Sequence, residues 1–156
     1  MQLRTFRNAP AVTPLHEALR RAQEAAGGTP SDFAAVPWRF RGLDAERART
    51  LAWVHAQTVA REKGEAAARG VYEKGTGVPG WIVVTCRKGR TPEEYERFSE
   101  RCRTAAQRFA LSLWSEEVQA EWITGATLDD PSFAETVGYD PDAETAVGIL
   151  WYGHEL

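Results

Sequence analysis

Residues 81–86 read WIVVTC, a continuous run of apolar and β-prone residues. Such a run is typical of a central strand that is covered on both faces. The eleven residues before it, 70–80, read GVYEKGTGVPG and are rich in glycine, so we expect a flexible loop there. The stretch therefore predicts a sheet whose middle strand lies between two layers of other elements.

A long helix is expected after this strand. Thr91 is a helix cap, Pro92 suits the first helical position, and Glu94 completes a capping box. Apolar residues then recur every three or four positions up to about residue 118, which is the spacing of one helix face. They are Tyr95, Phe98, Cys102, Ala105, Phe109, Leu113 and Trp114. We expect this helix to be the spine of the core.

Helices and strands alternate along the rest of the chain. Helices are predicted from Thr13 to Gly27 and from Asp44 to about Arg69, the second with a weak point at Gly64 that could divide it in two. A brief helix is expected from Asp130 to Gly138, and short strands at 38–41, 122–125 and 146–152. This order predicts an α+β fold, a single domain over residues 1–156, with helices packed around one small mixed β-sheet.

Composition excludes several classes of partner. The formal net charge is -3 over 156 residues, so no basic surface for nucleic acid is indicated. The first residues, MQLRTFRNAP, lack the apolar core of a secretory signal, and no run approaches the roughly 18 apolar residues of a membrane span. We expect a soluble cytoplasmic protein. Cys86 and Cys102 are the only cysteines and are expected to be reduced core residues.

The common motifs of covalent and phosphoryl-transfer catalysis are missing. The chain has no G-x-S-x-G, P-loop or G-x-G-x-x-G pattern. His16, His55 and His154 are isolated from one another, so their spacing does not support a metal site. The acidic residues at 93, 94 and 96 are explained by the dipole of the helix that they begin.

The N-terminal segment LRTFR is a candidate phosphate site. Arg4 and Arg7 lie three residues apart with Thr5 between them, and guanidinium forks with a hydroxyl are what a phosphate-bearing cofactor requires. From these residues alone a solvated basic arm is the favoured explanation, because two arginines near a terminus are common.

Five motifs in order carry a resemblance to a known family. The first is the segment at 3–7, and the second combines Pro30-Ser31 with PWRF at 37–40. The third is the strand from Gly80 with the helix from Pro92, the fourth is WITG at 122–125, and the fifth is VGILWYG at 147–153. In this order and spacing the chain resembles the nitroreductase family over nearly its whole length. The family is recognised by R-R-S-x-R, P-S-x-x-N-x-Q-P-W, a strand with a long helix, W-x-S-G and a closing V-G-x-L-x-x-G strand.

The resemblance implies a flavoprotein. An FMN would lie at the interface of an intertwined homodimer, accept hydride from NADH or NADPH, and pass electrons to nitro-aromatic, quinone or similar small-molecule acceptors. The flavin carries the chemistry, so no catalytic acid or base is expected from the protein. Carried onto this sequence, Arg4 and Thr5 would bind the phosphate, and Arg7 the phosphate or the pyrimidine edge. Pro30 and Ser31 would come from the partner, and Trp122, Ile123, Thr124 and Gly125 would line the ring.

Departures from the family pattern support a second hypothesis. Leu3 replaces the first arginine, while Ala34 and Val36 stand where asparagine and glutamine are usual. Gln119 and Ala120 fall near a glycine-rich turn of the family, and a basic C-terminal tail after residue 153 is lacking. These changes are what a flavin-free relative would show, a dimer that binds another ligand or a protein.

A third hypothesis is an interaction domain unrelated to the family, which would be a monomer without a shared pocket. Dimerisation is itself a prediction, because six tryptophans and many amphipathic helices in 156 residues indicate an apolar face that needs a partner.

Overall fold

The computed structural model describes residues 6–7, 15–27 and 36–155. Within them the elements are β1 (Phe6–Arg7), α1 (Leu15–Ala25), β2 (Trp38–Gly42), α2 (Ala45–Lys63), α3 (Glu65–Gly77), β3 (Gly80–Arg87), α4 (Pro92–Ser115), β4 (Gln119–Ile123), the 3₁₀ turn η2 (Ala126–Asp129), α5 (Pro131–Val137) and β5 (Glu144–Glu155). None of the helices in these ranges has the length and apolarity needed to cross a membrane.

The sheet is built around β5. This strand pairs with β3, β4 and β1, and β2 pairs with the far edge of β3. The α+β class is confirmed, but the expected mixed sheet is wrong for the described strands, because all four pairings are antiparallel. The apolar run at 81–86 reflects burial on both faces, and burial alone does not encode strand direction.

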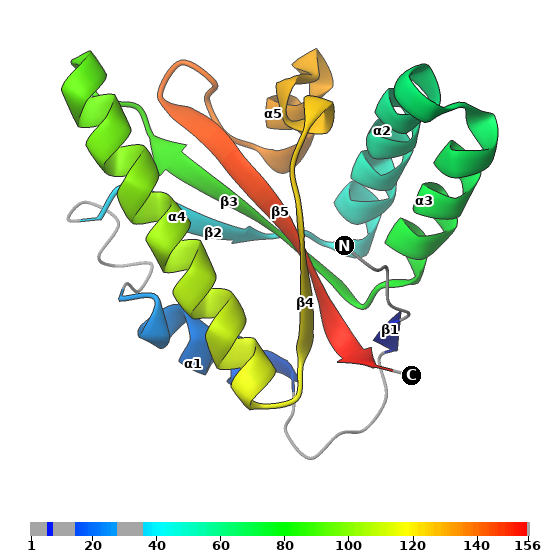
Figure 1. The fold of residues 1–156 in the computed structure, drawn as a ribbon, viewed down its shortest axis with the longest axis horizontal. Helices are drawn as coiled ribbons and strands as arrows, with labels where there is room; N and C mark the ends of the chain where they lie inside the picture. Colours follow the sequence, from blue (N-terminus) through cyan, green and yellow to red (C-terminus); the bar gives the residue numbers. More distant parts are fainter. Residues whose placement is uncertain (1–5, 8–14, 28–35, 156) are drawn as a thin grey trace.

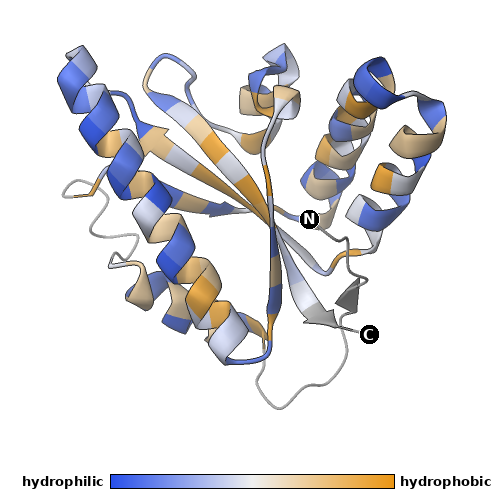
Figure 2. Ribbon diagram, viewed as in Figure 1, coloured by the Kyte–Doolittle hydropathy of each residue, from blue (hydrophilic) through white to orange (hydrophobic). Residues whose placement is uncertain are grey.

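Two layers of helices cover the two faces of the sheet. Figure 1 shows α1 and α4 on one side and α2, α3 and α5 on the other. Alternate residues of β3 supply each layer: Ile82 and Val84 join the α1/α4 core, while Trp81 and Val83 join the opposite core. The apolar colouring of β3 and β5 in Figure 2 follows from this double coverage. The predicted central strand is thereby confirmed.

Helix α4 begins as predicted and packs along the sheet. Thr91 caps it by accepting a hydrogen bond from the Glu94 backbone N–H at 3.1 Å. Cys102, Ala105, Phe109 and Leu113 are buried, and the Phe109 ring stacks on Phe40 at 4.5 Å. Tyr95 and Trp114, expected in the core, are exposed instead. The periodic stripe is wider than the buried face, so its margins remain in solvent.

Gly64 divides the second predicted helix into α2 and α3. Its φ of 90° is outside the helical range, and Asp44 caps α2 as expected. The loop predicted at 70–80 is wrong, because α3 continues to Gly77. Tertiary packing overrides the low helix propensity of glycine here. A Cβ on Gly75 would lie 3.1 Å from the Trp81 ring, so glycine allows α3 to approach the sheet closely.

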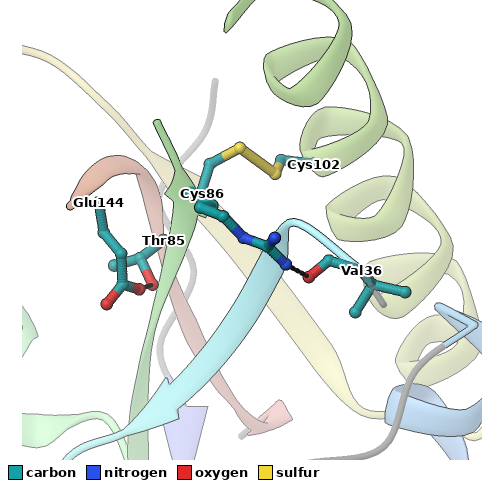
Figure 3. The surroundings of a disulfide bond; sticks show 6 residues. Val36, Thr85, Cys86, Cys102 and Glu144 are labelled. Carbon is teal, nitrogen blue, oxygen red and sulfur yellow. Dashed lines mark hydrogen bonds between the residues drawn. A yellow bond between two sulfur atoms is a disulfide. The ribbon is translucent and has the colours of Figure 1, made fainter. Parts of the chain in front are cut away.

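Cys86 and Cys102 form a disulfide, which corrects the expectation of two reduced thiols. Their Cα atoms lie 6.1 Å apart, within the range that a disulfide requires. Figure 3 shows the bond joining the end of β3 to the middle of α4. Sequence spacing does not reveal the pair, because the contact exists only once α4 has folded back over the sheet. The bond attaches the helix to the strand.

Candidate functional site

The predicted cofactor residues fall into three groups in the structure. Arg4, Thr5, Pro30 and Ser31 lie outside the described residues. Arg7 is described through its backbone, which pairs with His154 at the end of β5. The segment from Trp122 to Gly125 is described in full and follows β4 into the η2 turn.

Trp122 and Ile123 point to opposite faces of the sheet. Trp122 packs with the α4 layer, where its indole covers Gly148 so closely that a Cβ on that glycine would overlap it. Ile123 packs with the α2/α5 layer. Because successive side chains of a strand alternate, one flat ring cannot rest on both. A ring lined by this segment would contact one of these side chains and the backbone that follows.

That following backbone is open. Thr124 and Gly125 are exposed. Gly125 has a φ of 113°, and a Cβ there would meet no atom within 4 Å. A flat ligand can approach main-chain atoms at such a position without displacing a side chain. The described geometry therefore fits a planar ring beside Thr124 and Gly125.

Strand β5 sets the separation between the two candidate segments. Ile123 lies opposite Ile149, and Arg7 lies opposite His154. Positions 149 and 154 are about 17 Å apart at the usual rise of roughly 3.4 Å per strand residue. The backbones of the two candidate segments are therefore paired with well-separated positions of one strand.

His55 forms a hydrogen-bonded cluster beside the η2 turn. Its Nδ1 lies 2.6 Å from Thr127 Oγ1, and Thr127 Oγ1 lies 2.7 Å from Thr58 Oγ1. The Thr58 hydroxyl also donates to the His55 carbonyl at 2.8 Å. This cluster was not predicted from the sequence. The spacing of His55 and Thr58 on one helix face was a signal, but their contact with Thr127 depends on tertiary structure.

Burial lowers the pKa of His55 below its ordinary 6.5, while the Glu62 carboxylate opposes the shift. A depressed folded-state pKa means that the unfolded chain takes up the proton first. We predict that neutral His55 makes its full contribution to the free energy of unfolding above about pH 6.5. This contribution is lost as the pH falls through the folded-state pKa of His55. Urea unfolding of the wild type and of His55→Asn across this range tests it. Equal pH dependence in the two proteins contradicts the prediction.

A buried ion pair lies next to the ring-lining segment. Lys74 Nζ on α3 is 3.2 Å from Glu121 Oε2 on β4, with side-chain exposures of 12% and 7%. Glu121 precedes Trp122 and faces the α3 layer. The charged Glu121, directly before the apolar Trp122 and Ile123, was the only indication of this ion pair in the sequence. Its partner Lys74 lies in the stretch that was predicted to be a loop.

A groove, the α4 groove, runs along one side of α4. Its volume is about 440 Å³. It is lined mainly by apolar side chains of α4, β4 and β5: Arg103, Ala106, Gln107, Ala110, Leu111, Trp114, Ala120, Trp122 and Leu150. Leu111 and Trp114 are 58% and 50% exposed at its rim. So much exposed apolar surface is typical of an interface.

Structural comparison finds the same fold in nitroreductases. A nitroreductase-like family protein from Bacillus cereus has 18% identity and a TM-score of 0.73, with 100% of this chain and 81% of that chain covered. A putative nitroreductase from Desulfovibrio desulfuricans, in complex with FMN, has 19% identity and a TM-score of 0.65, covering 97% and 81%. A mutant FMN and NADPH-dependent nitroreductase from Sphigopyxis sp. strain HMH has 16% identity and a TM-score of 0.68, covering 99% and 84%.

Sequence comparison gives the family directly. A search of curated protein sequences returned no match. The family model described as Nitroreductase family, in contrast, matches residues 3–154. This range includes both the N-terminal LRTFR segment and the Trp122–Gly125 segment at the open end of β4. The chain belongs to the nitroreductase family.

Proposed function

We propose that the protein is an FMN-dependent oxidoreductase that transfers hydride from NADH or NADPH, by way of the flavin, to nitro-aromatic, quinone or similar acceptors. The proposal rests on the exposed backbone at Thr124 and Gly125. This backbone follows Ile123, whose partner on β5, Ile149, lies five residues before the partner of Arg7, His154. Similar structures in complex with FMN support it. Residues 1–156 would form one domain.

The protein's own residues would bind and orient the cofactor. Arg4 and Thr5 would hold the phosphate, and Arg7 the phosphate or the pyrimidine edge. Pro30 and Ser31 would reach the site from the partner of a homodimer. The backbone of Thr124 and Gly125, with Trp122 or Ile123, would line the ring. Bound flavin supplies the hydride chemistry, and the protein leaves one ring face open to acceptors.

Anaerobic reduction tests the function. The protein is loaded with FMN, mixed with NADH or NADPH, and followed by the loss of flavin absorbance. Reduction faster than that of free FMN, and reoxidation on adding a quinone or nitro-aromatic compound, are expected. Bound FMN that is reduced no faster than free FMN contradicts the proposal.

Arg4 is expected to dominate phosphate binding, because Leu3 removes a neighbouring donor. We predict that Arg4→Ala weakens FMN binding by about 1.5–3 kcal/mol, the range of a charged hydrogen bond. Isothermal titration with FMN and with riboflavin, which lacks the phosphate, measures the effect. The loss should appear with FMN alone, and an equal loss with riboflavin would show that Arg4 does not bind the phosphate.

A homodimer joined through the α4 groove is part of the proposal. Leu111 and Trp114 are exposed apolar side chains at its rim. We predict a dimer at micromolar concentration in sedimentation experiments and a monomer for Leu111→Glu, because a carboxylate cannot be buried unpaired at the contact. Tyr72→Glu, at an exposed apolar residue of α3 outside the groove, is the control and should remain a dimer. A monomeric wild type contradicts the prediction.

The second candidate is a flavin-free dimer that binds a ligand or a protein. The apolar lining of the α4 groove favours it, because an apolar groove of this size can hold a ligand or a protein segment without a flavin. A cytoplasmic location is also proposed, and the Cys86–Cys102 disulfide weighs against it, since disulfides are rare in reducing compartments. The thiol content of the protein in rapidly alkylated cell extracts decides that point.

A further inference from the structure

The three hydrogen bonds of His55, Thr58 and Thr127 have one consistent direction. Thr58 donates its hydroxyl hydrogen to the His55 carbonyl, which can only accept. Thr58 Oγ1 must then accept from the Thr127 hydroxyl, and Thr127 Oγ1 must accept from His55 Nδ1. If Thr127 donated to Nδ1 instead, only the two threonine hydroxyl hydrogens would be present for the three contacts, and one hydrogen bond would not form. The cluster is therefore a closed ring that requires a proton on Nδ1.

This ring fixes the tautomer of His55. Neutral imidazole has one N–H group. The hydrogen-bonded cluster with Thr58 and Thr127 places this hydrogen on Nδ1, so Nε2 keeps its lone pair. Protonation at Nε2 leaves the Nδ1–H in place. The hydrogen bond to Thr127 is consequently retained in both charge states of His55. The bond therefore fixes the position of Thr127 and does not respond to the protonation of His55.

Thr127 transmits that position to the open backbone. It is buried in η2, and its own carbonyl accepts from the Asp130 N–H at 3.2 Å. The Leu128 N–H donates to the Gly125 carbonyl at 3.2 Å, so the turn is closed on the residue that begins it. The Thr127 side chain thus joins this turn to α2 by hydrogen bonds, beside the apolar contact that Leu128 makes with the core of the α2/α5 layer.

We propose that His55 is a positioning residue of the flavin site: by donating from Nδ1 to Thr127 it fixes the η2 turn and holds the Gly125 backbone where the ring would lie. This inference rests on the proposed function. His55 contacts the turn and is assigned no step in the hydride transfer.

Three variants separate positioning from general stability. His55→Leu removes the donor, whereas His55→Asn retains an N–H near the place of Nδ1. Asp44→Ala removes the cap of the same helix and costs about 1 kcal/mol without touching Thr127. FMN affinity is measured by fluorescence titration, and stability by urea unfolding. We expect about tenfold weaker FMN binding for His55→Leu, which is the scale of one hydrogen bond. His55→Asn and Asp44→Ala should bind like the wild type.

The results distinguish this inference from the function on which it rests. Wild-type affinity in His55→Leu, or equal weakening in Asp44→Ala, overturns the inference alone. A wild type that binds no FMN overturns the proposed function and the positioning role together. Nitrogen-15 NMR of the histidine ring in the flavin-free protein tests the tautomer without any cofactor. A proton on Nδ1 supports the hydrogen-bonded cluster of His55, Thr58 and Thr127. A neutral imidazole with its proton on Nε2 overturns the inference.

Discussion

Replacing Lys74 with methionine is expected to lower the free energy of unfolding by about 3–5 kcal/mol, the usual cost of breaking a buried ion pair. The Glu121 carboxylate would lose the ammonium group 3.2 Å away while remaining almost fully buried. A carboxylate without a counter-charge in an apolar layer pays the full cost of desolvation. The loss should be visible as a lower urea midpoint at neutral pH.

Two further variants make this result specific. The double variant Lys74→Met with Glu121→Leu removes both charges and should recover most of the loss, because no unpaired charge is left. Lys63→Met, at an exposed lysine of α2, should change stability by less than about 0.5 kcal/mol. A loss below about 1 kcal/mol in Lys74→Met would mean that the pair behaves like a solvated one.

The second large effect is expected from the disulfide. It closes a loop with a sequence separation of 16 residues, for which the chain-entropy model gives a stabilisation of about 3 kcal/mol. The double variant Cys86→Ala with Cys102→Ala should lose about this amount. Urea unfolding with and without dithiothreitol measures it, and the double variant, which has no disulfide, should be insensitive to the reductant. Two titratable thiols in protein purified without reductant would contradict the assignment.

Much of the secondary structure was predictable because its signals are local. Thr91 with Glu94 marked the start of α4, Asp130 and Gly138 marked the ends of α5, and the apolar run at 81–86 marked β3. Each of these signals acts through neighbouring backbone groups or through burial of a continuous segment. The family resemblance rested on the order of such segments and is confirmed by the family match.

The errors arose where tertiary contacts decide the structure. The close approach of Gly75 to Trp81 extends α3 through a glycine-rich stretch, and the return of α4 over β3 creates the Cys86–Cys102 bond. The direction of the strands likewise follows from how the helices connect them. None of these contacts leaves a pattern in nearby sequence.

The candidate site was predicted in part. The resemblance pointed to the segment at 122–125, and the structure adds that its open part is the backbone of Thr124 and Gly125. The alternation of Trp122 and Ile123 follows from strand geometry and was available from the sequence. The roles of His55 and Glu121 could not be predicted from the sequence. Thr127, the partner of His55, lies 72 positions away, and Lys74, the partner of Glu121, lies 47 positions away.

The most direct test of the central claim is the absorbance spectrum of the purified protein after incubation with excess FMN and removal of unbound flavin on a desalting column. We expect flavin bands in the protein fraction, retained by the wild type and reduced in Arg4→Ala. A colourless wild-type protein would contradict the flavin-dependent function and leave the flavin-free nitroreductase-like dimer as the better description.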